Sequence, residues 1–235
     1  MRLHKYLAKC GVASRRKSEG IILEGRVTIN GLLVRDLAQP YQEGDTVCVD
    51  GKPVYLEEKK VYIMLNKPKD CVTTSDDQFS RRTVLDYIGD ISERLYPVGR
   101  LDYQTTGLLL LTNDGDLSYK ITHPSSHLNK VYHARLKSIP DAKSIKALES
   151  GLVIDGYKTA PATYKLLKDK PQVWVEIIIH EGRNRQVRKM LDQIGHPVLE
   201  LKRVAIGDIK LGKLKLGEYR HLSESEVDYL KNYEV

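Results

Sequence analysis

One acidic residue, Asp102, stands where a carboxylate can do chemistry. It lies in a polar loop between Gly99 and Gly107, directly before the apolar run 108–111. A run of this length, followed by Asn113-Asp114-Gly115, predicts a strand buried on both faces, although a buried helical segment has the same apolar pattern. Reactive side chains are common on a loop that such a rigid element holds. The alternative is that Asp102 only caps its own turn.

Three arginines lie at the start of a predicted helix over residues 185–194, namely Arg183, Arg185 and Arg188. Cations at this end oppose the helix dipole, and a polyanion would relieve them. Arg188 adjoins the apolar stripe of this helix, which consists of Val187, Met190, Leu191 and Ile194. A partly buried arginine requires a carboxylate partner, for which Asp102 is our choice. The alternative is a surface arginine that contacts only water or Asp192.

The other elements of residues 61–235 mix strands and helices without a regular βαβ alternation. Strands are predicted at 61–65, 130–137, 173–180, 199–206 and 214–219. Helices are predicted at 83–88 and 138–150. A further helix runs from a cap at Asp114 or Asp116 through Ile121, and the last one begins at the capping box 223–226. Pro140 is placed in the first turn of the 138–150 helix. The mixture predicts an α+β domain on a mixed, mainly antiparallel sheet.

Residues 1–58 are predicted to form a separate small module. One helix begins at Leu3 and ends at Gly11, and a second begins at an Ser14 cap and ends at Gly25. Two short strands, 27–30 and 32–34, flank Asn30-Gly31, which is the strongest short hairpin signal. The polar stretch 51–60 is interpreted as the linker to a second domain, 61–235.

This module is strongly basic. Before residue 36 it carries eight basic residues against Glu19 and Glu24, the eight being Arg2, Lys5, Lys9, Arg15, Arg16, Lys17, Arg26 and Arg35. Arg15, Arg16 and Lys17 occupy the first turn of the second helix, where cations cost stability unless an anion docks. A solvated charged face is the alternative. The placement favours RNA binding.

Composition describes an ordinary globular chain of 235 residues with 41% hydrophobic residues and a net charge of +7. The positive balance indicates a polyanionic partner only weakly. Neither a signal core nor an apolar run of membrane-spanning length is present, so we expect no membrane association. Three separated cysteines indicate neither disulfides nor a zinc site and favour the cytoplasm. No phosphate-cradling or dinucleotide motif occurs.

The stretch Gly-Arg-Leu-Asp-Tyr-Gln-Thr-Thr-Gly-Leu-Leu, residues 99–109, resembles the signature of the RsuA/RluB/RluE/RluF family of pseudouridine synthases. The resemblance runs almost to residue 235 and includes Asn66-Lys67-Pro68. Gly-Val-Ala-Ser-Arg-Arg (11–16) and Gly-Arg-Val-Thr-Ile-Asn-Gly (25–31) are similar to a small αL-type RNA-binding domain. The resemblance to the pseudouridine synthases implies that Asp102 is catalytic, that Arg188 pairs with Asp102, and that Tyr132 is an active-site tyrosine. The alternative for Tyr132 is a core aromatic on a strand.

The reaction that this resemblance implies is isomerisation of a uridine in ribosomal RNA to pseudouridine. This reaction involves no redox change and no net hydrolysis, so neither a metal nor an organic cofactor is expected, in agreement with the absence of such motifs. Arg188 would keep Asp102 ionised, Tyr132 would stack on the uracil, and Leu201 is a weaker candidate for an apolar pocket wall. The target base must leave its stack, which costs a few kcal/mol. Phosphate contacts would offset that cost, and the expected residues are Lys5, Arg15, Arg16, Lys17, Arg26, Arg100, Arg183 and Arg185.

Two other functions compete with this interpretation. A non-catalytic ribosome-associated RNA-binding or assembly protein would use the same scaffold, and a hydrolase would use Asp102 with His123 or His127. We expect a monomer. The subunit of the target RNA stays open. Residues 11–16 and 181–190 resemble family members that act on large-subunit RNA, whereas residues 1–10 and 217–224 resemble the small-subunit member.

Overall fold

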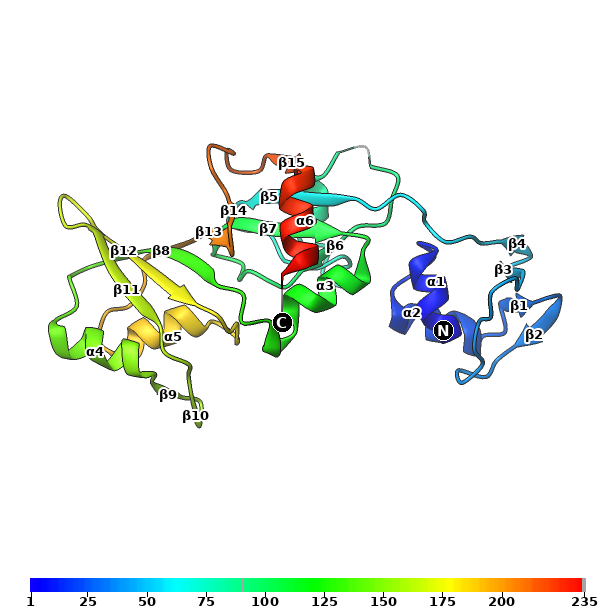
Figure 1. Cartoon of the computed structure of the whole chain (residues 1–235), viewed down its shortest axis with the longest axis horizontal. Helices are drawn as coiled ribbons and strands as arrows, with labels where there is room; N and C mark the ends of the chain where they lie inside the picture. The colour runs from blue at the N-terminus through cyan, green and yellow to red at the C-terminus, as the bar shows by residue number, and fades with distance from the viewer. Residues whose placement is uncertain (90, 234–235) are drawn as a thin grey trace. The chain divides into compact units, whose positions relative to one another are not determined.

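A computed structural model describes residues 1–89 and 91–233 of the chain (Figure 1). The chain forms two compact units. Unit 1 comprises residues 1–61 together with 91–94, and unit 2 comprises the described parts of 62–90 and 95–235. No described helix has the length and apolar character needed to cross a lipid bilayer.

Unit 1 packs two helices against a four-stranded sheet of order β2-β1-β3-β4. Its elements are α1 (Leu3–Lys9), α2 (Arg15–Leu23), β1 (Val27–Ile29), β2 (Leu32–Val34), β3 (Val47–Val49) and β4 (Lys52–Pro53). The predicted caps are confirmed: the Ser14 side chain accepts from the Lys17 backbone N–H. Asn30 and Gly31 both have positive φ, as the predicted hairpin turn requires.

The interpretation of 51–60 as a linker is wrong at its beginning. Lys52 and Pro53 pair with β3 and close the sheet of unit 1. Further on, the Glu57 side chain accepts from the Arg94 backbone N–H at 3.3 Å, and Lys59 pairs with Glu93 at 3.0 Å. The stretch therefore joins the packing of unit 1. The sequence did not predict that this stretch packs in unit 1, because its composition is polar and a two-residue strand has no detectable alternation.

Unit 2 is built on a nine-stranded sheet whose main path runs β11-β12-β8-β13-β7-β5-β15. Its strands are β5 (Tyr62–Lys67), β6 (Tyr96–Val98), β7 (Thr106–Thr112), β8 (Lys130–Leu136), β11 (Thr163–Lys168), β12 (Val173–Ile179), β13 (Glu200–Ile206), β14 (Ile209–Lys210) and β15 (Tyr219–His221), with a separate hairpin of β9 (Val153–Ile154) and β10 (Tyr157–Lys158). All pairs are antiparallel except β13 with β7. The predicted mixed, mainly antiparallel α+β fold is confirmed.

The helices of unit 2 cover this sheet. They are η1 (Val84–Tyr87), α3 (Gly115–Thr122), η2 (Pro124–Ser126), α4 (Ala142–Ser150), α5 (Gln186–Gln193) and α6 (Glu224–Asn232). Leu117 of α3 and Leu230 of α6 pack with Leu108 and Leu110 of β7 in one buried cluster. Every residue of β7 is buried, so the predicted doubly buried strand is confirmed and forms the rigid centre of the unit.

Two predictions for unit 2 need correction, and one strand was missed. The helix expected over 138–150 begins only after Asp141, whose side chain caps it, so Pro140 precedes the helix. The strand expected at 214–219 is a turn region, and pairing begins at Tyr219. Strand β11 was not predicted, because it is an edge strand with mostly exposed residues and no apolar alternation.

Candidate active site

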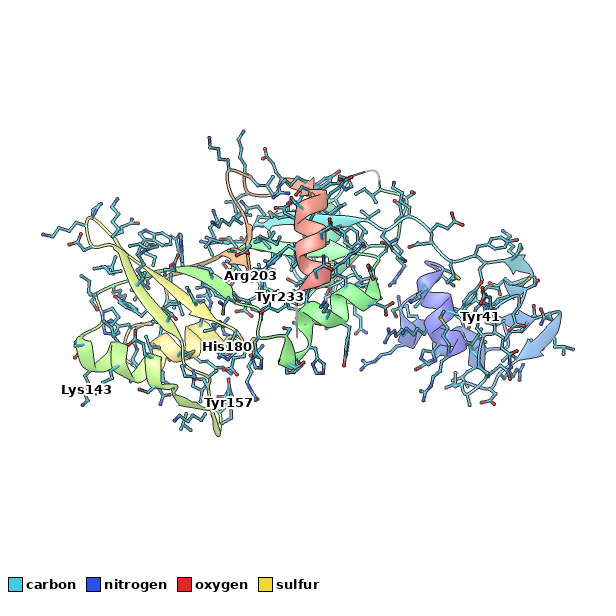
Figure 2. The ribbon with its side chains drawn as sticks, in the orientation of Figure 1. Tyr41, Lys143, Tyr157, His180, Arg203 and Tyr233 are labelled. Carbon is cyan, nitrogen blue, oxygen red and sulfur yellow. The ribbon has the colours of Figure 1, made fainter. Side chains whose placement is uncertain are left out.

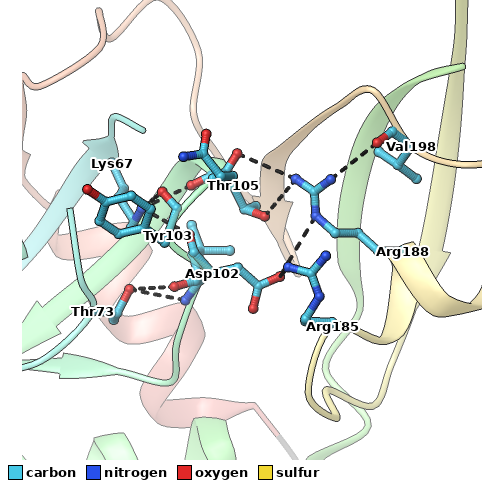
Figure 3. Close-up of polar contacts among 10 residues, drawn as sticks. Lys67, Thr73, Asp102, Tyr103, Thr105, Arg185, Arg188 and Val198 are labelled. Carbon is cyan, nitrogen blue, oxygen red and sulfur yellow. Dashed lines mark hydrogen bonds and ion pairs between the residues drawn. The ribbon is translucent and has the colours of Figure 1, made fainter. Parts of the chain in front are cut away.

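Asp102 lies in the loop that leads from β6 into β7, and two side chains fasten this loop to the body of unit 2 (Figure 3). The Thr73 hydroxyl donates to the Leu101 carbonyl at 2.7 Å and accepts from the Leu101 N–H at 3.3 Å. Inside the loop, the Thr105 N–H donates to the Asp102 carbonyl at 3.0 Å. The backbone around Asp102 is thus fixed on both sides, which leaves its carboxylate to face outward.

Lys67 is the second fastening and is fully buried at the end of β5. Its ammonium lies 3.0–3.3 Å from four backbone carbonyls, which belong to Pro68, Asp102, Tyr103 and Thr105. Burial lowers the pKa of Lys67 below its ordinary value, and the nearby Cys71, Asp102 and Asp70 oppose that shift. A buried cation that holds three carbonyls of one loop fixes the shape of that loop.

Two arginines approach the Asp102 carboxylate from the start of α5. Arg185 Nη1 and Arg188 Nε each lie 3.9 Å from Asp102 Oδ2. Arg185 takes the left-handed conformation, with φ of 54°, as the residue before the helix. The Asp102 side chain is 28% exposed, so its oxygens stay accessible between two cations. The distances are those of ion pairs rather than of hydrogen bonds, and the carboxylate has capacity for another partner.

Arg188 is held more firmly than Arg185. Its side chain is 12% exposed, and its guanidinium donates to the carbonyls of Val198 and Gln104 and to the Thr105 hydroxyl (Figure 3). Burial, and then the charge of Arg185, lower its pKa, while Asp102 raises it. The Nε atom is buried without a hydrogen-bond partner. The alternative of a surface arginine is therefore wrong, and the expected proximity of Arg188 to Asp102 is confirmed.

A cleft with a cavity volume of about 160 Å³ opens beside Asp102. Tyr132 of β8 and Leu201 of β13 line it, and both are nearly buried. Arg100, Arg183 and Arg185 line it from exposed positions. An acid at the edge of a cleft with an aromatic ring, an apolar wall and exposed cations suits a planar base attached to a polyanion.

Comparison with known proteins agrees with this geometry. Residues 61–193 match the family described as RNA pseudouridylate synthase, and residues 1–47 match the S4 domain. The chain belongs to the RNA pseudouridylate synthase family. Ribosomal large subunit pseudouridine synthase B of Bacillus subtilis is 44% identical over 233 residues, which cover 98% of this chain and 95% of the relative. An uncharacterized RNA pseudouridine synthase of Aquifex aeolicus is 45% identical, covering 98% and 93%.

A solved structure supports the assignment across the whole chain. The crystal structure of a pseudouridylate synthase is 34% identical and superimposes with a TM-score of 0.72, covering 98% of this chain and 99% of that one. The family resemblance and the expected RNA-binding module at the N-terminus are thereby confirmed. The described residues that line the cleft belong to unit 2.

The structure treats the expected RNA-binding residues of unit 1 differently. Arg15, Arg16 and Lys17 are exposed at the start of α2. Arg26, in contrast, donates to both carboxylate oxygens of Asp50 and also to Glu24. Because its charge is balanced within unit 1, we leave Arg26 out of the RNA contacts proposed below.

Sequence reasoning missed three cationic residues of this site: Lys67, Lys130 and Arg203. Each sits in or beside a strand with apolar neighbours, so an isolated lysine or arginine there was the available signal. Lys130 and Arg203 line the cleft. Among the described residues, no group of three His, Cys, Asp or Glu side chains has the arrangement of a metal site.

Proposed function

We propose that this pseudouridine synthase isomerises one uridine of large-subunit ribosomal RNA, with Asp102 as the catalytic carboxylate. The observation that carries the proposal is the placement of Asp102, accessible at the cleft with two guanidinium groups 3.9 Å away. A relative named ribosomal large subunit pseudouridine synthase B, 44% identical over nearly the whole chain, supports the choice of RNA.

The chemistry needs an anionic group at the nucleoside. The Asp102 carboxylate attacks the nucleoside, the bond between N1 and C1′ breaks, and the uracil turns. Carbon 5 then bonds to C1′ and the bond to Asp102 breaks, which regenerates the carboxylate. Carbon 5 loses its proton and N1 gains one, so that no atom is gained or lost overall. Arg188 holds the carboxylate in place, Tyr132 supports the face of the base, and Leu201 excludes water from the opposite side.

Extraction of the base costs a few kcal/mol, and contacts to phosphates offset that cost. In unit 2, Arg100, Arg183 and Arg185 line the cleft. Arg183 lies over the Tyr157 ring, with its Cζ 3.8 Å from the ring centroid, which leaves its donors for phosphate oxygens. Lys5, Arg15, Arg16 and Lys17 of unit 1 supply further contacts. We assign residues 1–58 to RNA binding and 61–235 to catalysis, a division that the two compact units support.

We also propose that the protein acts as a monomer. Ribosomal RNA as the proposed substrate supports a cytoplasmic location, where ribosomal subunits are assembled. A non-catalytic assembly protein would not need an accessible acid beside two arginines, so the geometry favours the enzyme.

The test compares pseudouridines in the ribosomal RNA of cells that lack this chain with those of cells that carry plasmid-encoded variants. We expect one uridine of large-subunit RNA to lose its modification, and the wild-type chain to restore it. Asp102→Asn should bind RNA normally yet be slower by about 10⁴-fold or more. Asp169→Asn, a change at an exposed acid outside the cleft, is the matched control and should restore full modification.

Restoration by Asp102→Asn would remove Asp102 from its role. Loss of a small-subunit pseudouridine would keep the reaction and refute the choice of subunit. An unchanged modification pattern in both RNAs would favour the non-catalytic assembly protein.

A further inference from the structure

Arg203 is a buried arginine that the reaction described above does not use. It lies on β13 in unit 2 (Figure 2), and the residue is 3% exposed. Its Nε donates to the Leu108 carbonyl at 2.8 Å, which fixes the guanidinium against β7. Gly107 brings the two strands close, because a Cβ there would lie 2.1 Å from the Arg203 carbonyl oxygen.

The guanidinium of Arg203 is not satisfied within the protein. Its Nη2 is buried without a hydrogen-bond partner, and within the described part of the chain the structure pairs it with no carboxylate. A buried charge without a partner is costly, so a partner that arrives with a ligand is expected. Since Arg203 lines the cleft beside Asp102, that ligand is the one that enters this cleft.

A second cation lies close to Arg203. Lys130 also lines the cleft, and its ammonium donates to the carbonyls of Leu128 and His180, each at 3.1 Å. Burial first, and then the charge of Arg203, lower the pKa of Lys130 to about 8, whereas Glu181 raises it. Two mutually repelling cations, with few counter-charges, make the inner end of the cleft positive.

Strand register places these cations around the expected base. Arg203 is opposite Tyr132 in the pairing of β13 with β8, and Leu201 precedes Arg203 by two positions on the same face. Lys130 precedes Tyr132 by two positions on its own strand. The ring platform, the apolar wall and both cations therefore share one face of the sheet.

We propose that Arg203, with Lys130 beside it, binds a carbonyl oxygen of the target uracil and stabilises the negative charge that the base acquires during isomerisation. This inference rests on the proposed function. When N1–C1′ breaks, the electron pair of that bond stays on the uracil and is delocalised onto its carbonyl oxygens. If the carboxylate instead attacks carbon 6, the electrons also move onto a carbonyl oxygen. Both routes need a donor at that atom.

A base carbonyl fits this site better than a phosphate does. The exposed arginines at the cleft, Arg183 and Arg185, are placed for the backbone, which stays hydrated. Arg203 is buried next to the tyrosine ring, where a flipped base enters and its sugar–phosphate chain does not follow. The donor is also rigidly held before substrate arrives, as stabilisation of developing charge requires.

The test uses a short RNA that contains the mapped uridine, with single-turnover kinetics and a separate measurement of RNA affinity. Arg203→Met should slow pseudouridine formation by about 100-fold or more, with RNA affinity changed less than about threefold. Arg203→Lys, which keeps a cation, should recover part of the rate. Lys202→Met is the matched control, since Lys202 adjoins Arg203 on the opposite face of β13, and its rate should be unchanged.

A second test changes atoms of the substrate, and its first part uses only the wild-type enzyme. RNAs with 2-thiouridine or 4-thiouridine at the target replace one carbonyl oxygen with sulfur, a weaker acceptor. For the wild-type enzyme, one of them should react about tenfold more slowly than uridine, and Arg203→Met should reduce that difference to about twofold or less.

Equal rates of the wild type on all three RNAs would overturn the inference. So would weakened RNA binding with an unchanged rate in Arg203→Met, because that result identifies a phosphate contact. If the wild type itself forms no pseudouridine in ribosomal RNA, the proposed function fails first. An active wild type with an equally active Arg203→Met refutes the role of Arg203 alone.

Discussion

Replacement of Lys67 by Met tests whether the buried ammonium positions the catalytic loop. The ammonium has three protons for four carbonyls within 3.3 Å. Without it, the Asp102 carbonyl keeps the Thr105 N–H as donor, and the Tyr103 carbonyl keeps the Asp70 N–H. The carbonyl of Thr105 loses its ammonium donor, and that of Pro68 keeps only the weak Cys71 thiol.

The expected destabilisation follows from these two acceptors. A buried acceptor left unpaired costs about 1–3 kcal/mol, so two cost roughly 2–6 kcal/mol. Lys67→Met also removes the cost of burying a charge, which the lowered pKa of Lys67 indicates, and this offsets part of the destabilisation. We expect Lys67→Met to lower the free energy of unfolding of unit 2 by about 3 kcal/mol, which corresponds to roughly 6–12 °C in Tm.

The assay is urea unfolding followed by the fluorescence of Trp174, the single tryptophan of the chain, which lies on β12 in unit 2. Single-turnover kinetics should show a further loss of about 100-fold in folded Lys67→Met, because small displacements of a reacting group have effects of that size. Lys69→Met, at an exposed position two residues away, is the matched control. If the stability and the rate of Lys67→Met equal those of Lys69→Met within error, the positioning role of Lys67 is refuted.

Two further predictions concern pH and salt. Since the pKa of Lys130 is lowered to about 8 in the folded state, the unfolded state binds more protons above that pH. The wild type should therefore gain stability relative to Lys130→Met between pH 7 and pH 10, and a constant difference in chemical denaturation would contradict this. Simultaneous Arg15→Ala and Arg16→Ala should reduce the salt slope of RNA binding by about one per lost phosphate contact. An unchanged slope, equal to that of Lys143→Ala at an exposed position on α4, would show that α2 does not touch RNA.

Local chemistry was sufficient to predict much of the scaffold. The hairpin at Asn30-Gly31, the cap at Ser14 and the capping box at Ser223 each depend on residues within a few positions of one another. The doubly buried β7 was also visible, because its apolar run has the length of a strand. Weak local signals explain the errors: β11 is an exposed edge strand, and in the 214–219 segment Leu214 packs against the core without strand pairing, while Leu216 is exposed.

The sequence by itself determined the parts of the site: the acid in its loop, the arginines before α5, and the tyrosine on an alternating strand. Only the tertiary structure decided which of these side chains meet. Parallel pairing of β13 with β7 brings Arg203 beside the Asp102 loop, although residues 102 and 203 are far apart in the chain. Whether a charged side chain is buried, and whether it has a hydrogen-bond partner there, depends on its surroundings in the fold and not on its residue type. That is why the roles of Lys67 and Arg203 emerge only when their neighbours are known.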